Sequence, residues 1–165
     1  MNRWLAGQMA NLSGSVSFLC PTMNSYRRFK DFSAVPMTSS WSRDNRSTAL
    51  RLITNSESAI RIENCIGAAD LNPYLALATT IAAGLAGLEH ELPLPDECEK
   101  LAWGDNDELE KLPTTITKAI DALAGNQYLS KYLGRDFTEY WVNTRRSEWL
   151  AFHTEGGDPE SKSVT

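Results

Sequence analysis

The sequence predicts an α/β fold in which antiparallel strands are followed by helices. Apolar and polar side chains alternate over residues 47–53 and again over 60–65, on either side of a polar turn, which is typical of a β-hairpin. From residue 72 onward, apolar residues recur every three or four positions, which is typical of helices. A chain of 165 residues suits one compact unit with a single core.

The chain begins with a predicted helix over residues 2–10, because Trp4, Leu5 and Met9 have near-helical spacing. Residues 22–41 are polar, contain Pro36 and lack a period, so we expect an extended loop there. Loops of this length on compact proteins are frequently functional. We therefore treat residues 22–41 as a candidate substrate loop.

The predicted hairpin, with its turn at residues 54–58, should bury one face of each strand. Successive side chains of a strand point to opposite sides of the sheet, so every second residue shares a face. The apolar side chains that we expect to be buried together are Leu50, Leu52, Ile60 and Ile62.

A buried helix is predicted after the hairpin. Asn72 is a candidate N-cap and Pro73 suits the first helical position. Residues 74–88 are apolar almost all round, which indicates burial on every side. Further helices are expected in the acidic C-terminal half, at residues 113–124, 127–133 and 136–153.

The composition excludes several classes of protein. Hydrophobic residues make up 42% of the chain and charged residues 22%, which is ordinary for a globular protein. The apolar run 74–88 is shorter than the roughly 20 residues that a membrane-spanning helix needs. The N-terminus lacks the apolar core of a secretory signal. We therefore expect a cytoplasmic protein without a membrane partner.

Charge is distributed unevenly along the chain. The formal net charge of −5 argues against nucleic acid as a partner. Residues 26–65 contain seven cations and four acids, a balance of +3, which leaves −8 for the remainder. This segment should therefore face an anion. The three cysteines lack CxxC spacing and lie far from both histidines, so we expect neither a disulfide framework nor a zinc site.

The second face of the hairpin carries Arg51, Arg61 and Glu63, and Arg46 precedes it. Guanidinium groups clamp phosphate and carboxylate oxygens in forked geometry, and a carboxylate supplies the hard oxygen that Mg²⁺ prefers. The pattern suits a ligand that brings negative charge and a metal ion. The alternative is a solvated face of ion pairs, worth about 0–1 kcal/mol per exposed pair. Periodicity alone leaves both interpretations open.

Four motifs in order resemble the glutamine synthetase family, in the C-terminal part of its catalytic domain. They are PTMNSYRRF at 21–29, WSRDNRSTALRL at 41–52, RIE at 61–63 and GAADLNPYLALA at 67–78. Each motif is weak alone, but their order and spacing make the combination specific. The resemblance runs from the first helix to about His153 and covers a minor part of the family's full length.

The resemblance implies an activity and a fold. Members of the family make a γ-glutamyl phosphate from glutamate and ATP, and ammonia or an amine then displaces the phosphate, with Mg²⁺ or Mn²⁺ as cofactor. Cations and arginines neutralise the charge that develops in such a phosphoryl transfer. The implied fold is the C-terminal portion of the catalytic domain over residues 1–154, followed by a disordered tail over 155–165. The implied partner is either further copies of the chain or a missing N-terminal half.

The resemblance also implies roles for individual residues. Arg28 resembles the arginine that holds the substrate amino acid. Arg46 resembles the catalytic arginine at the transferred phosphoryl group, where it would touch both substrate and ATP. Arg51 and Arg61 resemble arginines that bind the nucleotide phosphates, and Glu63 resembles a metal ligand.

Cys65 is the first departure from the family pattern, because an arginine that binds the substrate carboxylate is expected there. A thiol is a weak donor, so each lost charge-assisted bond should cost roughly 1.5–3 kcal/mol of substrate affinity. Cys65 is either an inert replacement or a reactive thiol whose pKa is lowered by the nearby arginines.

Ala34 is the second departure. Ammonia-using members carry a glutamate at this position, in a loop that shields the acyl phosphate. Its loss and the DNR form of the arginine motif resemble the γ-glutamyl-amine branch, which includes γ-glutamylpolyamine and γ-glutamylmethylamide synthetases. An organic amine is therefore the expected nucleophile.

The third departure is that most of the family's metal-binding carboxylates lie outside this sequence, and Glu63 alone cannot hold two cations. Two hypotheses follow from the residues that are present and those that are missing. The chain is either the C-terminal catalytic segment of an ATP-dependent glutamate–amine ligase, or a non-catalytic remnant that binds nucleotide or another subunit. A nucleic-acid-binding module is the third and least supported alternative, because the cations are few.

Overall fold

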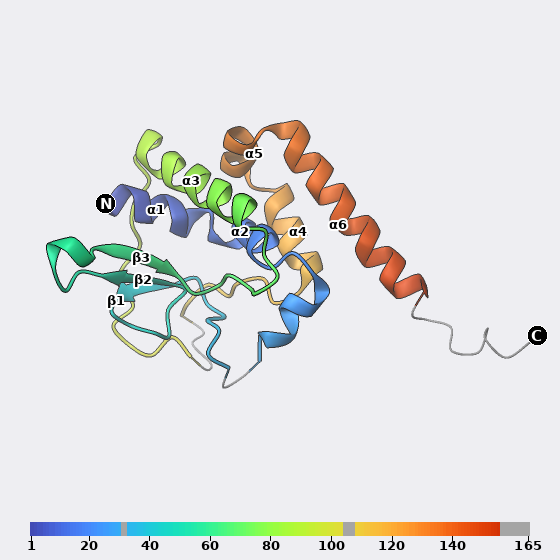
Figure 1. Ribbon diagram of the computed structural model, residues 1–165. Coiled ribbons are helices and arrows are strands. Elements are labelled where there is room, and N and C mark those ends of the chain that lie inside the picture. The colour runs from blue at the N-terminus through green and yellow to red at the C-terminus, as the bar shows by residue number, and fades with distance from the viewer. Residues whose placement is uncertain (31–32, 104–107, 156–165) are drawn as a thin grey trace, which may run out of the picture.

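The computed structural model of the chain describes residues 1–30, 33–103 and 108–155. Its elements, in chain order, are α1 (Asn2–Ala10), α2 (Leu12–Leu19), the 3₁₀ helix η1 (Met23–Arg28), β1 (Trp41–Arg43), β2 (Leu50–Ile53), the 3₁₀ helix η2 (Glu57–Ala59), β3 (Arg61–Asn64), α3 (Pro73–Glu89), α4 (Ile116–Ala124), α5 (Gln127–Leu133) and α6 (Arg135–Glu155). In Figure 1 the small sheet lies below α1 and α3, and α6 extends away from the rest of the protein. The predicted α/β class is confirmed.

The β2–β3 hairpin has the predicted antiparallel pairing. Arg51 lies opposite Glu63, and Leu52 lies opposite Ile62. β1 adds a third strand, parallel to β2, which begins at Trp41, the last residue of the stretch that we expected to be an extended loop. This strand was not predicted, because three residues are too few to show a period. β1 is held by its pairing, and the indole of Trp41 donates a 2.8 Å hydrogen bond to the Pro95 carbonyl.

The apolar face of the hairpin is buried only in part. Leu50 and Leu52 belong to the core, and Ile62 packs against it, as expected. Ile60 is 46% exposed, so the prediction that it is buried was wrong. The β2–β3 ladder ends at the pair of Ile53 with Arg61, and Ile60 therefore lies outside it.

α1 and α3 cross at unusually close range because both helices carry glycine at the contact. A Cβ built at Gly7 would lie 2.6 Å from the Gly87 nitrogen, and one built at Gly84 would lie 2.4 Å from the Trp4 indole. Close packing of this kind requires residues without side chains on both helices. The glycines thus decide which face of α3 is turned inward.

The caps of α3 are those expected, but its burial is not. Asn72 accepts hydrogen bonds from the two backbone nitrogens of Tyr74 and Leu75, at 3.0 and 3.3 Å, and Pro73 is the first helical residue. The prediction of burial all round was wrong, because the small residues face inward and the large ones face outward. The exposed side chains, here called the α3 apolar stripe, are Leu77, Ile81, Leu85 and Leu88.

The C-terminal helices follow the prediction closely. α4 begins at Ile116, three residues later than expected, because the Thr115 hydroxyl caps it by accepting from the Lys118 nitrogen. α5 has the predicted bounds and α6 starts one residue earlier than expected. The predicted tail lies almost entirely outside the described residues, and the division at residue 154 stays a prediction. None of the described helices is long and apolar enough to cross a membrane.

Candidate functional site

The charged face of the hairpin is built around Glu63, which bridges two arginines. One carboxylate oxygen lies 2.7 Å from Arg51 Nη2, and the other lies 2.9 Å from Arg61 Nη2 and 3.0 Å from Arg61 Nε. The ladder causes this arrangement, because Arg51 is directly opposite Glu63 and Arg61 precedes Glu63 by two residues on the same face. The expectation that these three side chains share one face is confirmed.

The two arginines of the bridge differ in their surroundings. The Arg51 side chain is only 15% exposed, and its Nε is buried without a hydrogen-bond partner. The Arg61 side chain is 53% exposed, and it also donates to the Ala59 carbonyl at 3.1 Å. Arg51 therefore keeps an unused buried donor, while Arg61 lies at the rim.

Arg46 lies in the turn between β1 and β2, which is held by side chains on either side of it. The Asn45 side-chain oxygen accepts from the Ser47 nitrogen at 3.0 Å and from the Ser47 hydroxyl at 2.7 Å. Arg46 itself is exposed, and its guanidinium makes no ion pair or hydrogen bond among the residues that the structure describes. A firmly shaped turn thus presents a cation that has no partner among the described residues.

Arg28 ends η1 and lies against the loop that follows β3. Its Nη1 donates to the Gly67 carbonyl at 3.1 Å, and its Nη2 lies 3.8 Å from the Cys20 sulfur. Its Nε is buried without a partner. The structure therefore places Arg28 beside the stretch that begins two residues after Cys65.

Cys65 lies at the end of the charged face and is half-buried. Its backbone nitrogen donates to the Ala49 carbonyl at 2.9 Å, which continues the pairing with β2 by one residue. Burial raises the pKa of the Cys65 thiol above its ordinary value, and the opposing effect of Arg51 is smaller. This direction is opposite to the lowered pKa on which the reactive-thiol hypothesis relied.

The described residues do not by themselves fit a metal ion. Glu63 is the carboxylate that the sequence pointed to, and both of its oxygens are bound by arginines. Across residues 1–30, 33–103 and 108–155, no three His, Cys, Asp or Glu side chains are grouped so that they could hold a cation. The arginines are better suited to phosphate, because guanidinium groups donate to its oxygens in forked geometry and Arg46 is exposed without a partner among the described residues.

Asp70 is the residue of the site region that the sequence analysis missed. Its carboxylate accepts from the Thr22 hydroxyl at 2.5 Å and from the Ser25 hydroxyl at 2.9 and 3.0 Å. Desolvation acts to raise the pKa of Asp70, but these hydrogen bonds and the charge of Arg28 outweigh it and lower the pKa. The available signal was the T-x-x-S pattern of a capping box, formed by Thr22 and Ser25, which overlaps the NSYRR motif.

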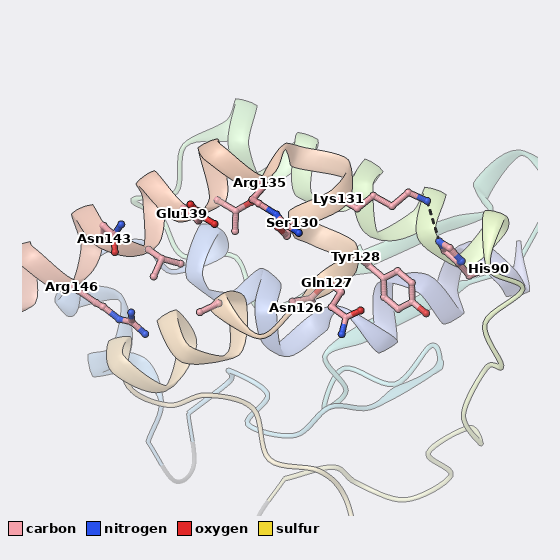
Figure 2. A pocket seen from close by; sticks show the side chains of 13 residues that line it. His90, Asn126, Gln127, Tyr128, Ser130, Lys131, Arg135, Glu139, Asn143 and Arg146 are labelled. Atoms are coloured by element: carbon pink, nitrogen blue, oxygen red, sulfur yellow. Dashed lines mark hydrogen bonds between the residues drawn. The ribbon is translucent and has the colours of Figure 1, made fainter.

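A wide groove with a volume of about 990 Å³ lies elsewhere, between α5 and α6 (Figure 2). Its lining is mostly polar, and Figure 2 shows Lys131 reaching toward His90. Two of its cations are already paired, Lys131 with Glu89 at 2.6 Å and Arg146 with Asp121 at 2.8 Å. None of the sequence-predicted site residues lines this groove, so the candidate site remains at the hairpin.

Comparison with known proteins agrees with this geometry. The chain matches the family described as "Glutamine synthetase, catalytic domain" over residues 1–163. "Gamma-glutamylputrescine synthetase PuuA" of Escherichia coli (strain K12) is 36% identical over 154 residues, which cover 92% of this chain and 32% of that protein. "Type-1 glutamine synthetase 2" of Dictyostelium discoideum is 35% identical over 156 residues, which cover 91% of this chain and 29% of that protein. The solved structure "Apo GmaS without ligand" has a TM-score of 0.81 and 28% identity, and covers 93% of this chain and 35% of that chain.

The fold and the family match define the class of this chain as part of a glutamine-synthetase-type catalytic domain. The chain belongs to the glutamine synthetase family, and its fold is the one that a part of the family's catalytic domain adopts. The predicted resemblance is confirmed, with relatives that include γ-glutamyl-amine synthetases as well as glutamine synthetases. The chain spans about a third of the length of the curated relatives it matches.

Proposed function

We propose that this chain is the phosphate-facing part of a ligase that joins glutamate to ammonia or an organic amine through a γ-glutamyl phosphate, with ATP as phosphoryl donor. The observation that carries this proposal is the hairpin face on which Glu63 bridges Arg51 and Arg61. A structural ion pair needs one arginine per carboxylate, whereas two arginines with spare donors suit a polyanion.

The three arginines of this face have different tasks in the proposal. Arg46 is the catalytic residue, because its exposed guanidinium can follow the phosphoryl group from ATP to glutamate and neutralise the charge that develops. Arg51 and Arg61 bind the phosphates that remain with the nucleotide.

Glutamate binds at Arg28, on the side of the site formed by η1 and the β3–α3 loop. Cys65 lies where a second cation would hold the substrate carboxylate, so the amino acid is held by one arginine fewer than in the family pattern. Ala34 is exposed and carries no carboxylate to accept a proton from ammonium. These two residues favour an amine as the nucleophile, in line with the amine-ligating relatives.

Divalent cations, Mg²⁺ or Mn²⁺, supply charge neutralisation at the phosphates of such a ligase. Because both oxygens of Glu63 are engaged, the remaining ligands must come from outside these described residues. In the proposal they belong to the rest of the catalytic domain, on the same polypeptide or on another subunit of a cytoplasmic assembly. That part packs on the α3 apolar stripe, which is free of charged residues.

A second candidate function is a non-catalytic module that binds nucleotide or another subunit. Two observations favour it: no group of side chains among the described residues fits a metal ion, and position 65 holds a thiol in place of an arginine. Glutamate-dependent release of ADP separates the two candidates, measured with Mg²⁺ or Mn²⁺ and ammonium, methylamine or putrescine. We expect release that rises with an amine and is lost in Arg46→Ala. Nucleotide binding without any release, by the chain assembled with the rest of the catalytic domain, would overturn the ligase and support the module.

A further inference from the structure

Asp70 connects two segments that are far apart in sequence. Its three hydrogen bonds reach Thr22 and Ser25, at the start of η1, from 45 and 48 residues away. Thr22 and Ser25 also bond to each other, since the Thr22 nitrogen donates to the Ser25 hydroxyl at 3.1 Å. The carboxylate thus completes a network in which every donor hydroxyl has an acceptor, which fixes the beginning of η1.

The other end of η1 is fixed by Arg28, which bonds to the same loop. Arg28 Nη1 donates to the Gly67 carbonyl, three residues before Asp70. Ala68, between them, donates from its backbone nitrogen to the Leu19 carbonyl at 2.9 Å. η1 is therefore held at its first turn by Asp70 and at its last residue by Gly67, and a 3₁₀ helix of six residues has little stability of its own.

The same loop is continuous with β3 and α3. Glu63 lies in β3, two residues before the loop, and Asn72 caps α3 two residues after Asp70. The loop thus connects the charged hairpin to α3, and hydrogen bonds join η1 to this loop. Asp70 is the sole anionic side chain of this loop, residues 65–72.

We propose that Asp70 is a positioning residue, which holds η1 against the β3–α3 loop and thereby sets the orientation of Arg28 relative to the hairpin arginines. The role of Arg28 toward the substrate amino acid rests on the proposed function, whereas the anchoring by Asp70 does not. Asp70 acts through Arg28, because its own oxygens are already occupied by the two hydroxyls.

The buried Nε–H of Arg28 provides a direct readout. Three arginines, Arg28, Arg51 and Arg145, have a buried Nε without a partner, so their Nε–H protons should exchange slowly with water. In ¹⁵N-labelled chain, NMR can follow the three signals separately. Arg51 serves as the internal control, since it lies on the hairpin, whereas Arg145 donates to the Pro21 carbonyl beside Thr22 and is not independent of η1.

Asp70→Ala is expected to speed exchange at Arg28 by about tenfold or more, because two or three hydrogen bonds to a charged acceptor are lost. The Arg51 signal should change less than about twofold. Asp70→Asn, which keeps one acceptor oxygen, and Thr22→Val, which removes one donor, should give smaller increases. Asp96→Asn, at an exposed aspartate, is the matched control and should have no effect.

Two outcomes would overturn the anchoring. One is Arg28 exchange that is unchanged in all three variants, and the other is equal acceleration at Arg28 and Arg51, which would indicate a global loss of stability. If Asp70→Ala does not fold, Asp70→Asn and Thr22→Val decide the question in the same way. In the ligase reaction, Asp70→Asn should raise the KM for glutamate and leave the KM for ATP unchanged. Faster Arg28 exchange with an unchanged KM would refute the substrate role of Arg28 and leave the anchoring intact.

Discussion

Arg51 and Glu63 lie directly opposite each other in the β2–β3 ladder, and an ion pair of 2.7 Å joins their side chains. The pair links a candidate phosphate-binding arginine to the candidate metal ligand. Any cation that reaches Glu63 must compete with Arg51 for it, and an arginine released in this way becomes available to an anion. The two functions proposed for this face are therefore coupled by one contact.

Removing the charge of Glu63 tests how much the bridge contributes to the fold. Glu63→Gln should lower the free energy of unfolding by about 1–3 kcal/mol, because the largely buried guanidinium of Arg51 loses its anion. Arg61→Ala should cost less than about 0.5 kcal/mol, since Arg61 is exposed. Urea unfolding measures both. Equal losses in the two variants would show that burial does not distinguish the arginines.

Arg46→Ala should weaken nucleotide binding without affecting the fold. The loss of one or two charge-assisted bonds to phosphate, at about 1.5–3 kcal/mol each, corresponds to a tenfold or greater rise in Kd for ATP. The melting temperature should not change, because Arg46 is exposed and forms no ion pair with a described residue. Calorimetric titration with ATP provides the Kd. An unaltered Kd for ATP would show that Arg46 does not bind the nucleotide phosphates.

The stability contributed by Asp70 should depend on pH. Its pKa is lower in the folded chain than the value of about 3.9 in an unfolded one, so the ionised form favours folding. The contribution is complete above that value and is lost as the pH falls through the folded pKa. Wild type should therefore be more stable than Asp70→Asn at pH 7, and the difference should shrink below about pH 4. Thermal unfolding measures this difference in stability between the two proteins. A difference that is independent of pH from 7 to 2.5 would show that ionisation of the Asp70 carboxylate does not stabilise the fold.

Cys65 should be a poor nucleophile near neutral pH. Its pKa is raised by burial, so little thiolate is present at pH 7.5, and alkylation by iodoacetamide should be slower than for a cysteine in an unstructured peptide. The rate should increase as the pH is raised toward and beyond 9. Mass spectrometry of the labelled peptide distinguishes Cys65 from Cys20 and Cys98. Rapid labelling at pH 7 would restore the reactive-thiol interpretation.

Gly7→Ala should separate α1 from α3. The added methyl group would lie 2.1 Å from the Ala83 carbonyl oxygen, so the helices must move apart, at a cost of about 1–3 kcal/mol or more. Gly125→Ala is the control, because its nearest neighbour lies at 3.6 Å and its φ of −84° suits alanine. That substitution should be neutral or stabilise by about 0.4–1 kcal/mol. Thermal unfolding compares the two.

Local pattern accounts for the parts of the fold that sequence analysis predicted. The alternation around residues 54–58 gave the correct hairpin, and with it the shared face of Arg51, Arg61 and Glu63. The side-chain cap at Asn72 fixed the start of α3. Both features depend on neighbours within a few residues, which a single sequence displays directly.

The parts that were missed depend on contacts over longer distances. α2 is buried almost all round, so its residues show no amphipathic period. Asp70 acts on residues 45 and 48 positions away, and nothing in its own motif indicates that contact. The inward face of α3 is selected by glycines that meet α1, and an apolar sequence cannot show which of its faces will find a partner.

The α3 apolar stripe has a consequence for the life of this chain in a cell. Four large aliphatic side chains, each between 42% and 63% exposed, form a continuous surface of the kind that chaperones and proteases recognise on unfinished proteins. A copy whose stripe is uncovered would be retained or degraded, and a copy whose stripe is covered would persist. The amount of folded chain in the cell would then depend on the amount of the partner that packs on the α3 apolar stripe. Assembly would therefore be the step that limits the concentration of the chain.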